Sequence, residues 1–276
     1  MAESIQALIF DLDDTLLIEV ASADAAFVET CQLAEERFGV DAEAMRETIR
    51  KTSQSHWHRA PDRAYCVRIG ISSWEGLWAR FDGPGDSLRT MRDWAPMYRR
   101  AAWSDALNAH DIDDLPFADE LAEAFFRSRR TLHRLFDDTL PTLASLRGRY
   151  RMGLLTNGAS DLQREKIDGA RIGTYFDATA ISGDVGVKKP QPQMFEAILA
   201  KLGVQAPEAV MVGNSLVADV AGAQNVGIRT VWLNRTGKEN RSETVPDAEI
   251  LGLKELPELL PTIRGPKVKG GRSGGF

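Results

Sequence analysis

The chain has 276 residues, of which 43% are hydrophobic and 27% are charged. This length suffices for one large domain or for a core with a smaller inserted domain, and the composition excludes a largely disordered chain. With 34 basic and 40 acidic residues the formal net charge is −6, so we expect no overall electrostatic attraction to nucleic acid or to an anionic membrane.

The N-terminal segment predicts a buried strand rather than a signal peptide. Residues 5–10 form a short apolar run rich in β-formers that stops abruptly at acidic residues, and no positively charged region precedes it. No stretch of the chain approaches the roughly 18 to 20 apolar residues that a membrane span needs. We therefore expect a cytoplasmic protein that does not bind a membrane.

Residues 17–139 are predicted to be a helical insertion without strand–helix alternation. Amphipathic patterns predict helices over 24–39, from the capping residue Asp41 onwards, and over 117–128, with a loop at 81–87. Five of the six tryptophans lie here. Core packing explains them most simply, and a wall over a ligand or a dimer surface is the alternative. Cys31 and Cys66 also lie here, and we expect two reduced, partly buried thiols.

From about residue 150 onwards, strand-like runs alternate with helical stretches. The strand-like runs cover 152–156, 178–182, 209–213 and 228–233, and the helical stretches cover 160–170, 192–203 and 216–227. Such alternation predicts a parallel sheet with helices on both faces. The predicted domains are an α/β core of residues 1–16 and 140–264, a helical cap of residues 17–139, and a disordered basic tail of residues 265–276.

Two carboxylates follow the first predicted strand directly. Asp11 stands at its end, and Asp13 comes two residues later in the departing loop. The carboxyl edge of a parallel sheet is where open α/β folds bind ligands. Carboxylates this close repel each other unless a cation or a proton lies between them. The pattern therefore indicates a site for a hard divalent cation, a nucleophile with an acid/base partner, or both.

Three further polar segments are expected at the same edge of the sheet. Thr156 and Asn157 follow the second strand and can form an oxygen cradle of phosphate size. Lys189 precedes a proline and is one of two adjacent lysines in a loop, where it can neutralise carboxylates and a substrate phosphate. Asn214 and Asp219 follow the fourth strand.

The ordered combination of strand-DxDxT, strand-TN, Lys-Pro and strand-GNSxxxD resembles the haloacid dehalogenase (HAD) superfamily. The match is closest to its phosphatase branch with a helical cap inserted after the first motif. The resemblance covers about residues 5–235, although in the cap only position and helical character match. It implies an α/β fold: a Rossmann-like parallel sheet in a three-layer sandwich, with an inserted all-helical cap domain.

The resemblance also implies an activity, which is Mg²⁺-dependent hydrolysis of a small-molecule phosphomonoester through an aspartyl-phosphate. Asp11 would be the nucleophile and Asp13 the general acid and base. Thr156 and Asn157 would hold the phosphoryl oxygens, and Lys189 would orient the nucleophile and stabilise charge. Magnesium would bind the Asp11 carboxylate, the Asp13 backbone carbonyl and a side chain of the fourth motif. The expected partner is a small phosphorylated metabolite, and a homodimer is possible.

One position departs from the family pattern. The fourth motif usually begins Gly-Asp, whereas this chain has Gly213 followed by Asn214. An amide oxygen can still ligate Mg²⁺ but lacks the formal charge. We therefore predict weaker metal binding, partly compensated if Asp219 lies near the ion. The departure also leaves open a catalytically weakened protein that only binds a phosphorylated metabolite.

Other chemistries of the superfamily differ from this pattern by single residues. Dehalogenases generally lack the second acid and use no magnesium, so Asp13 argues against that activity. Phosphonatases use a cap lysine as a Schiff base, and the predicted cap contains a single lysine, Lys51. A phosphomutase retains both aspartates and remains an alternative. Nucleotide monophosphates, sugar phosphates and phosphoglycolate all remain open as substrates, and Arg59, Arg63 and Arg68 are candidates for a second anionic group.

Overall fold

The computed structural model describes residues 4–263, and within them six strands form one sheet of the order β3-β2-β1-β4-β5-β6. The strands are β1 (Ala7–Phe10), β2 (Arg151–Thr156), β3 (Ala178–Ile181), β4 (Ala209–Gly213), β5 (Arg229–Leu233) and β6 (Ala248–Ile250). All neighbouring strands are parallel. The chain adds β2 and β3 on one side of β1 and then adds β4, β5 and β6 on its other side. The direction of the chain therefore switches between β1 and β4, the switch point of the sheet. Ligands of such sheets bind at the carboxyl ends of these strands.

Both faces of the sheet are covered, as the unbroken apolar character of β1 predicts. Leu8 and Phe10 pack on one side with α7 (Thr139–Leu146) and α12 (Leu256–Leu259). Ala7 and Ile9 point to the other side and pack with α10 (Pro192–Leu202) and α11 (Gly222–Asn225). The predicted Rossmann-like α/β sheet with helices on both faces is thereby confirmed.

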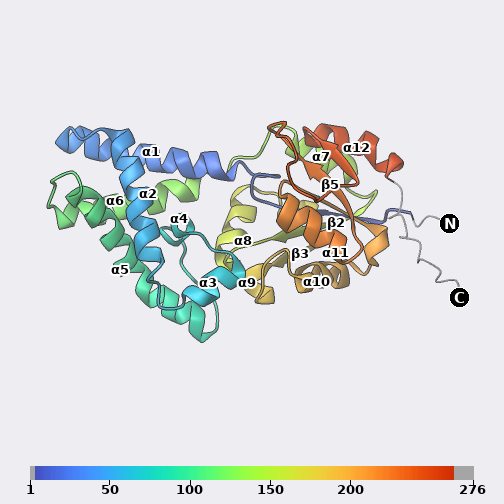
Figure 1. Cartoon of the computed structure of the whole chain (residues 1–276), viewed down its shortest axis with the longest axis horizontal. Coiled ribbons are helices and arrows are strands. Elements are labelled where there is room, and N and C mark those ends of the chain that lie inside the picture. Colours follow the sequence, from blue (N-terminus) through green and yellow to red (C-terminus); the bar gives the residue numbers. More distant parts are fainter. Residues whose placement is uncertain (1–3, 264–276) are drawn as a thin grey trace, which may run out of the picture.

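Six helices lie between β1 and α7 and form a separate body, here called the helical lobe. They are α1 (Glu19–Phe38), α2 (Ala42–Trp57), α3 (Arg63–Ile69), α4 (Ser73–Gly76), α5 (Asp86–Asn108) and α6 (Leu115–Thr131). Figure 1 shows this lobe beside the sheet and its covering helices, here called the sheet lobe. The exact domain boundaries given above remain predictions.

Helix α8 (Ser160–Gly169) links the apolar cores of the two lobes. The core of the helical lobe contains large aromatic side chains such as Trp78 and Trp103, and Leu162 of α8 packs into it. Ile167 of the same helix packs instead into the core on one face of the sheet. Figure 1 places α8 and the short α9 (Ser182–Val185) where the two lobes meet. The carboxyl edge of the sheet therefore faces the helical lobe.

The sequence predictions hold for most elements and fail for short or weakly patterned ones. The strand β6 was not predicted, because it has three residues and only the last is buried. Helix α5 was also missed, and it starts inside the predicted 81–87 loop at Asp86. The segment predicted as one helix over 216–227 is a π-helical stretch, Leu216–Ala221, followed by α11. The basic tail lies outside the described residues.

The cysteine prediction is confirmed, since Cys31 and Cys66 are free and buried. None of the helices within residues 4–263 combines the length and apolar character that crossing a membrane requires.

Candidate active site

Asp11 follows β1 directly and is 7% exposed at the carboxyl edge of the sheet. Its Oδ1 accepts a hydrogen bond from Lys189 Nζ at 2.6 Å, and its Oδ2 accepts one from the Thr15 hydroxyl at 2.9 Å. The Asn214 backbone N–H donates to the same Thr15 oxygen at 3.2 Å. The loops after β1 and β4 thus fix the Asp11 carboxylate in one orientation.

Lys189 is buried and uses all three N–H donors of its ammonium group. Besides Asp11 it binds Oδ1 of Asp219 at 2.7 Å and the Leu155 carbonyl at 2.8 Å. Burial alone would lower the pKa of Lys189, but the two carboxylates raise it above its ordinary value. The structure thus brings the ammonium group of Lys189 next to the Asp11 carboxylate, and the predicted role of Lys189 in orienting the nucleophile stays a prediction.

Asp219 is a partner of this lysine. Its second oxygen accepts from the Ser215 backbone N–H at 3.0 Å. Burial raises the pKa of Asp219 to about 6, and Lys189 opposes that shift. The predicted support of a metal ion by Asp219 stays a prediction, because the contacts of this carboxylate are with Lys189 and the 215 backbone.

Thr156 and Asn157 lie at the end of β2, at the same edge. The Asn157 amide oxygen accepts from the Lys189 backbone N–H at 2.8 Å, so this side chain holds the lysine loop in place. The Thr156 hydroxyl accepts from Gln163 Nε2 of α8 at 2.5 Å. Their predicted role as holders of phosphoryl oxygens stays a prediction.

Asp13 faces α8 and the helical lobe. Gln163 Nε2 donates to its Oδ2 at 3.0 Å, and Lys166 Nζ contacts both of its oxygens at 3.1 Å. Burial raises the pKa of Asp13 to about 7, although the positive charge of Lys166 lowers it. A carboxyl group with a pKa near neutral pH can both donate and accept a proton during a reaction.

Gln163 and Lys166 lie three residues apart on one face of α8 and were not among the predicted site residues. Both lie on the helix that directly follows the Thr156–Asn157 motif, and this position could have indicated that they face the site. Glu19 of α1 and Glu75 of α4, which contact Lys166 from the helical lobe, were also not among the predicted site residues. No local pattern marks Glu19, and the Ser72–Glu75 capping box marks Glu75 only as part of a helix start, since the burial of both acids depends on contacts far apart in the sequence.

Asp11 is the one acidic side chain among the predicted magnesium ligands, because the fourth motif has Asn214 in place of the usual aspartate. Within residues 4–263 no three side chains of the His, Cys, Asp and Glu types are grouped as metal ligands. Asp11, the Asp13 carbonyl and the amide of Asn214 are nevertheless hard oxygen donors, which fit Mg²⁺ in type. Asn214 is exposed and, with Asp14, lines a cavity of about 430 Å³. The residues present therefore fit Mg²⁺, with a ligand set that carries less negative charge than the family pattern.

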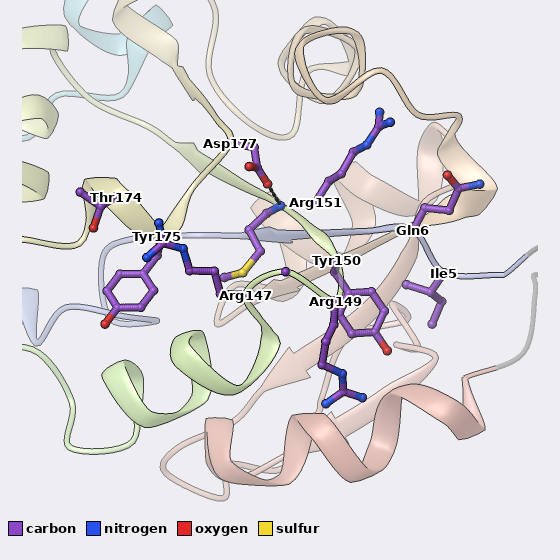
Figure 2. A pocket seen from close by; sticks show the side chains of 11 residues that line it. Ile5, Gln6, Arg147, Arg149, Tyr150, Arg151, Thr174, Tyr175 and Asp177 are labelled. Atoms are coloured by element: carbon purple, nitrogen blue, oxygen red, sulfur yellow. Dashed lines mark hydrogen bonds between the residues drawn. The ribbon is translucent and has the colours of Figure 1, made fainter.

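A cavity of about 470 Å³ lies at the opposite, amino-terminal edge of the sheet. Figure 2 shows that its three arginines, Arg147, Arg149 and Arg151, point in different directions. Arg147 lies over the Tyr175 ring, and Arg151 donates to the Gly203 carbonyl. Because their guanidinium groups do not converge, this cavity does not form an anion site, and it lies far from the ligand edge of the sheet.

Three basic residues of the predicted insertion are exposed or have other contacts. Lys51 is exposed on α2 and pairs with Glu47. Arg68 donates to the Gly186 carbonyl at 3.0 Å and so ties α3 to the sheet lobe. Arg59 is exposed. A role of these arginines in binding a second anionic group stays a prediction.

Comparison with known proteins agrees with this geometry. The sequence model of the haloacid dehalogenase-like hydrolase family matches residues 5–227. A phosphoserine phosphatase of Thermus thermophilus is 37% identical over 251 residues, which cover 90% of this chain and 96% of the relative. An N-acylneuraminate-9-phosphatase of Mus musculus is 29% identical over 267 residues, with 94% and 95% coverage. A solved 2-haloacid dehalogenase of Pseudomonas syringae has a TM-score of 0.61 and 26% identity, and covers 94% of this chain and 99% of its own.

Proposed function

Because the chain belongs to the haloacid dehalogenase-like hydrolases and is a phosphoric monoester hydrolase, we propose that it hydrolyses a small soluble phosphomonoester through an aspartyl-phosphate on Asp11. The observation that carries the proposal is the arrangement of Asp11, Asp13 and Lys189 at the switch point of the sheet. Lys189 lies 2.6 Å from the nucleophile candidate, and Asp13 has a pKa near neutral pH.

In the first step an Asp11 carboxylate oxygen attacks phosphorus, and the bond between phosphorus and the alkoxide oxygen breaks. Asp13 gives its proton to that leaving oxygen. Attack by an anion on an anionic ester is opposed by repulsion, which the ammonium of Lys189 offsets at close range. Splitting the displacement into two steps is the general advantage of such a nucleophile.

In the second step the Asp13 carboxylate accepts a proton from water, whose oxygen attacks the phosphorus of the aspartyl-phosphate. Inorganic phosphate leaves and the Asp11 carboxylate is restored. Gln163 holds both Asp13 and Thr156 by the same amide nitrogen, which supports a fixed position of Asp13 relative to the phosphoryl site.

Magnesium is the proposed cofactor, held by the Asp11 carboxylate, the Asp13 carbonyl and the Asn214 amide oxygen. When bound, the ion would supply positive charge that weakens the repulsion between Asp11 and the phosphoryl oxygens. We also propose a cytoplasmic location, because both thiols are free and buried.

Two competing activities of the family are disfavoured by particular residues. The second acid, Asp13, supports phosphoryl transfer over dehalogenation, in which no alkoxide needs a proton. A Schiff-base route would need Lys51, which is exposed on α2. A phosphomutase would keep every residue named above, and a weakened binding protein would follow from Asn214.

The test is phosphate release from a panel of phosphomonoesters with and without Mg²⁺. Phosphoserine and sugar phosphates are the first probes, in view of the phosphatase relatives. We expect turnover that Mg²⁺ stimulates, and we expect Asp11→Asn to lower it by at least about 10³-fold with an unchanged circular dichroism spectrum. Equal activity of wild type and Asp11→Asn, or phosphate transfer to a second sugar without release, would refute the proposal.

A further inference from the structure

Lys166 is a second buried lysine near the proposed active site, and it lies where the two lobes meet. Its side chain has 0% exposure. Its ammonium contacts Asp13 of the sheet lobe at 3.1 Å, Glu19 at 3.0 Å and Glu75 at 3.3 Å. Both glutamates belong to the helical lobe. One ammonium group therefore joins an active-site carboxyl to two carboxylates of the other lobe.

The two glutamates are held by their own lobe. Glu19 also pairs with the fully buried Arg129 at the end of α6. The other oxygen of Glu75 accepts hydrogen bonds from the backbone N–H of Ser72 at 2.9 Å and from its hydroxyl at 2.7 Å. Both carboxylates thus have fixed positions whenever the helical lobe keeps its fold.

The ammonium of Lys166 also lies over two aromatic rings of the helical lobe. It is 5.9 Å from the ring centre of Trp74 and 6.0 Å from that of Trp78. Burial alone would lower the pKa of Lys166, but the negative charges of Asp13, Glu19 and Glu75 raise it above its ordinary value. A buried ammonium is stable only with such partners, because an unpaired buried charge is costly.

Most of the partners of Lys166 come from the helical lobe, so its position depends on the contact between the lobes. If the helical lobe moved away, Lys166 would lose both glutamates and both rings. It would then be free to leave Asp13, whose carboxyl group would keep only the hydrogen bond from Gln163.

On the basis of the proposed function, we propose that Lys166 is a positioning residue that holds Asp13 in place for proton transfer while Glu19 and Glu75 of the helical lobe hold Lys166. The contact between the lobes thereby fixes the orientation of the acid/base. Lys166 touches no reacting atom in this scheme and acts through Asp13.

The test compares two substrates that depend differently on Asp13. An alkyl phosphate needs a proton on its leaving oxygen, whereas p-nitrophenyl phosphate has a leaving group that departs without one. Because Asp13 also serves the second step, which both substrates share, the comparison uses kcat/KM, which reports the first step. We expect Lys166→Met to lower kcat/KM for the alkyl phosphate by about 30- to 100-fold and for p-nitrophenyl phosphate by less than about 3-fold. Lys166→Arg, which retains the charge, should recover most of the loss.

Glu75→Gln tests the link to the helical lobe without altering the lysine. It should lower kcat/KM for the alkyl phosphate selectively, by about 5- to 10-fold. Lys254→Met is the matched control, because Lys254 is an exposed lysine of the sheet lobe, and it should leave both rates unchanged. Binding of a beryllium fluoride phosphoryl mimic checks that the Asp11 pocket of each variant is folded. If Lys166→Met does not fold, Glu75→Gln decides the question.

The outcomes separate this inference from the function on which it rests. Equal losses for the two substrates in Lys166→Met and Glu75→Gln would overturn the positioning role and leave the phosphatase proposal standing. A wild-type protein that releases phosphate from neither substrate would overturn the proposed function, and the inference with it.

Discussion

Asn214 keeps the backbone contacts of its loop while its side chain differs in charge from the family pattern. Its N–H donates to Thr15 at 3.2 Å, and its carbonyl accepts from the Trp232 indole at 3.0 Å. The main chain is thus fixed from two sides. A substitution here should change the ligand charge without moving the loop.

We predict that Asn214→Asp tightens Mg²⁺ binding by about 10-fold, because a carboxylate adds Coulomb attraction of the order of 1 to 2 kcal/mol near the surface. The measurement is the Mg²⁺ concentration for half-maximal phosphate release. Asn108→Asp, at an exposed position at the end of α5, serves as control. An affinity that is unchanged or weaker in Asn214→Asp would contradict the assignment of this residue as a ligand.

His133 lies at the lobe boundary, where its ring packs against that of Trp78. Its two ring nitrogens are buried and have no hydrogen-bond partner among the described residues. Burial lowers its pKa to about 4, and the positive charge of Arg129 adds to the effect. A group whose pKa is lower in the folded than in the unfolded protein stabilises the fold above the unfolded pKa, and this contribution is lost as pH falls towards the folded pKa.

Accordingly, the free energy of unfolding should fall between about pH 6.5 and pH 4 by about 1 to 2 kcal/mol through His133, a value reduced for its partial exposure. The measurement is urea unfolding at a series of pH values. His133→Gln should remove this part of the acid sensitivity, whereas His58→Gln, at an exposed position, should not. Identical pH profiles for wild type and His133→Gln would disprove the prediction.

The lysines show which residues of the site the sequence could reveal. Lys189 was found because a proline follows it and because its motif stands in order with three others. Lys166 was missed because lysine is normally exposed, and its burial depends on Glu19 and Glu75, which are distant in the sequence. The order of the motifs in the sequence reveals residues at the carboxyl edge of the sheet. It does not reveal residues whose position depends on contacts between the lobes.

At the scale of elements, the loop after β1 controls how the first helix of the helical lobe begins. Asp14 has a positive φ of 56°. Its Oδ1 accepts hydrogen bonds from the backbone N–H groups of Glu19 at 2.9 Å and Val20 at 3.2 Å. It therefore satisfies free donors at the start of α1 and ties that helix to the active-site loop.

Asp14→Ala should lower the free energy of unfolding by about 1 kcal/mol, as the loss of a helix cap does. It should also reduce turnover, because α1 carries Glu19 to Lys166. Asp41→Ala is the matched control, since Asp41 caps α2 through the Ala44 N–H at 2.8 Å and lies away from the site. Chemical denaturation and phosphate release measure the two effects. A turnover loss of the same size in both variants would show that the cap acts only through stability.

The sequence predicted elements whose periodicity is strong and failed where tertiary contacts decide. β1, β2 and β4 are short apolar runs buried on both faces, which their composition signals. Helix α5 contains Pro96 and several charged residues, so its apolar face is less obvious. β6 is formed by pairing with β5 and carries almost no pattern of its own.

At the scale of the whole molecule, two apolar cores meet at α8. Leu162 is 1% exposed and belongs to the core of the helical lobe although its helix starts from the sheet. The position of the helical insertion was predictable from the change in pattern. The contact that holds it against the sheet was not, because it depends on which face of α8 turns away from the sheet.

Leu162→Ala should cost about 2 to 4 kcal/mol and separate the unfolding of the two lobes. Tryptophan fluorescence reports mainly on the helical lobe, which contains five of the six tryptophans, while far-ultraviolet circular dichroism reports on both lobes. The two transitions should diverge in Leu162→Ala. In Leu143→Ala, which truncates the core beside the sheet, they should shift together. Coincident transitions in Leu162→Ala would contradict this role of α8.

The placement of the two cysteines has a practical consequence. Cys31 and Cys66 both lie in the core of the helical lobe, each at 0% exposure, and burial raises the pKa of each thiol to about 12. A chromogenic disulfide reagent reacts with thiolate, so it can modify them only in molecules whose helical lobe has opened. The rate of colour formation under native conditions therefore measures how often that lobe opens, with no engineered label, and a bound substrate analogue that slows it stabilises the closed form.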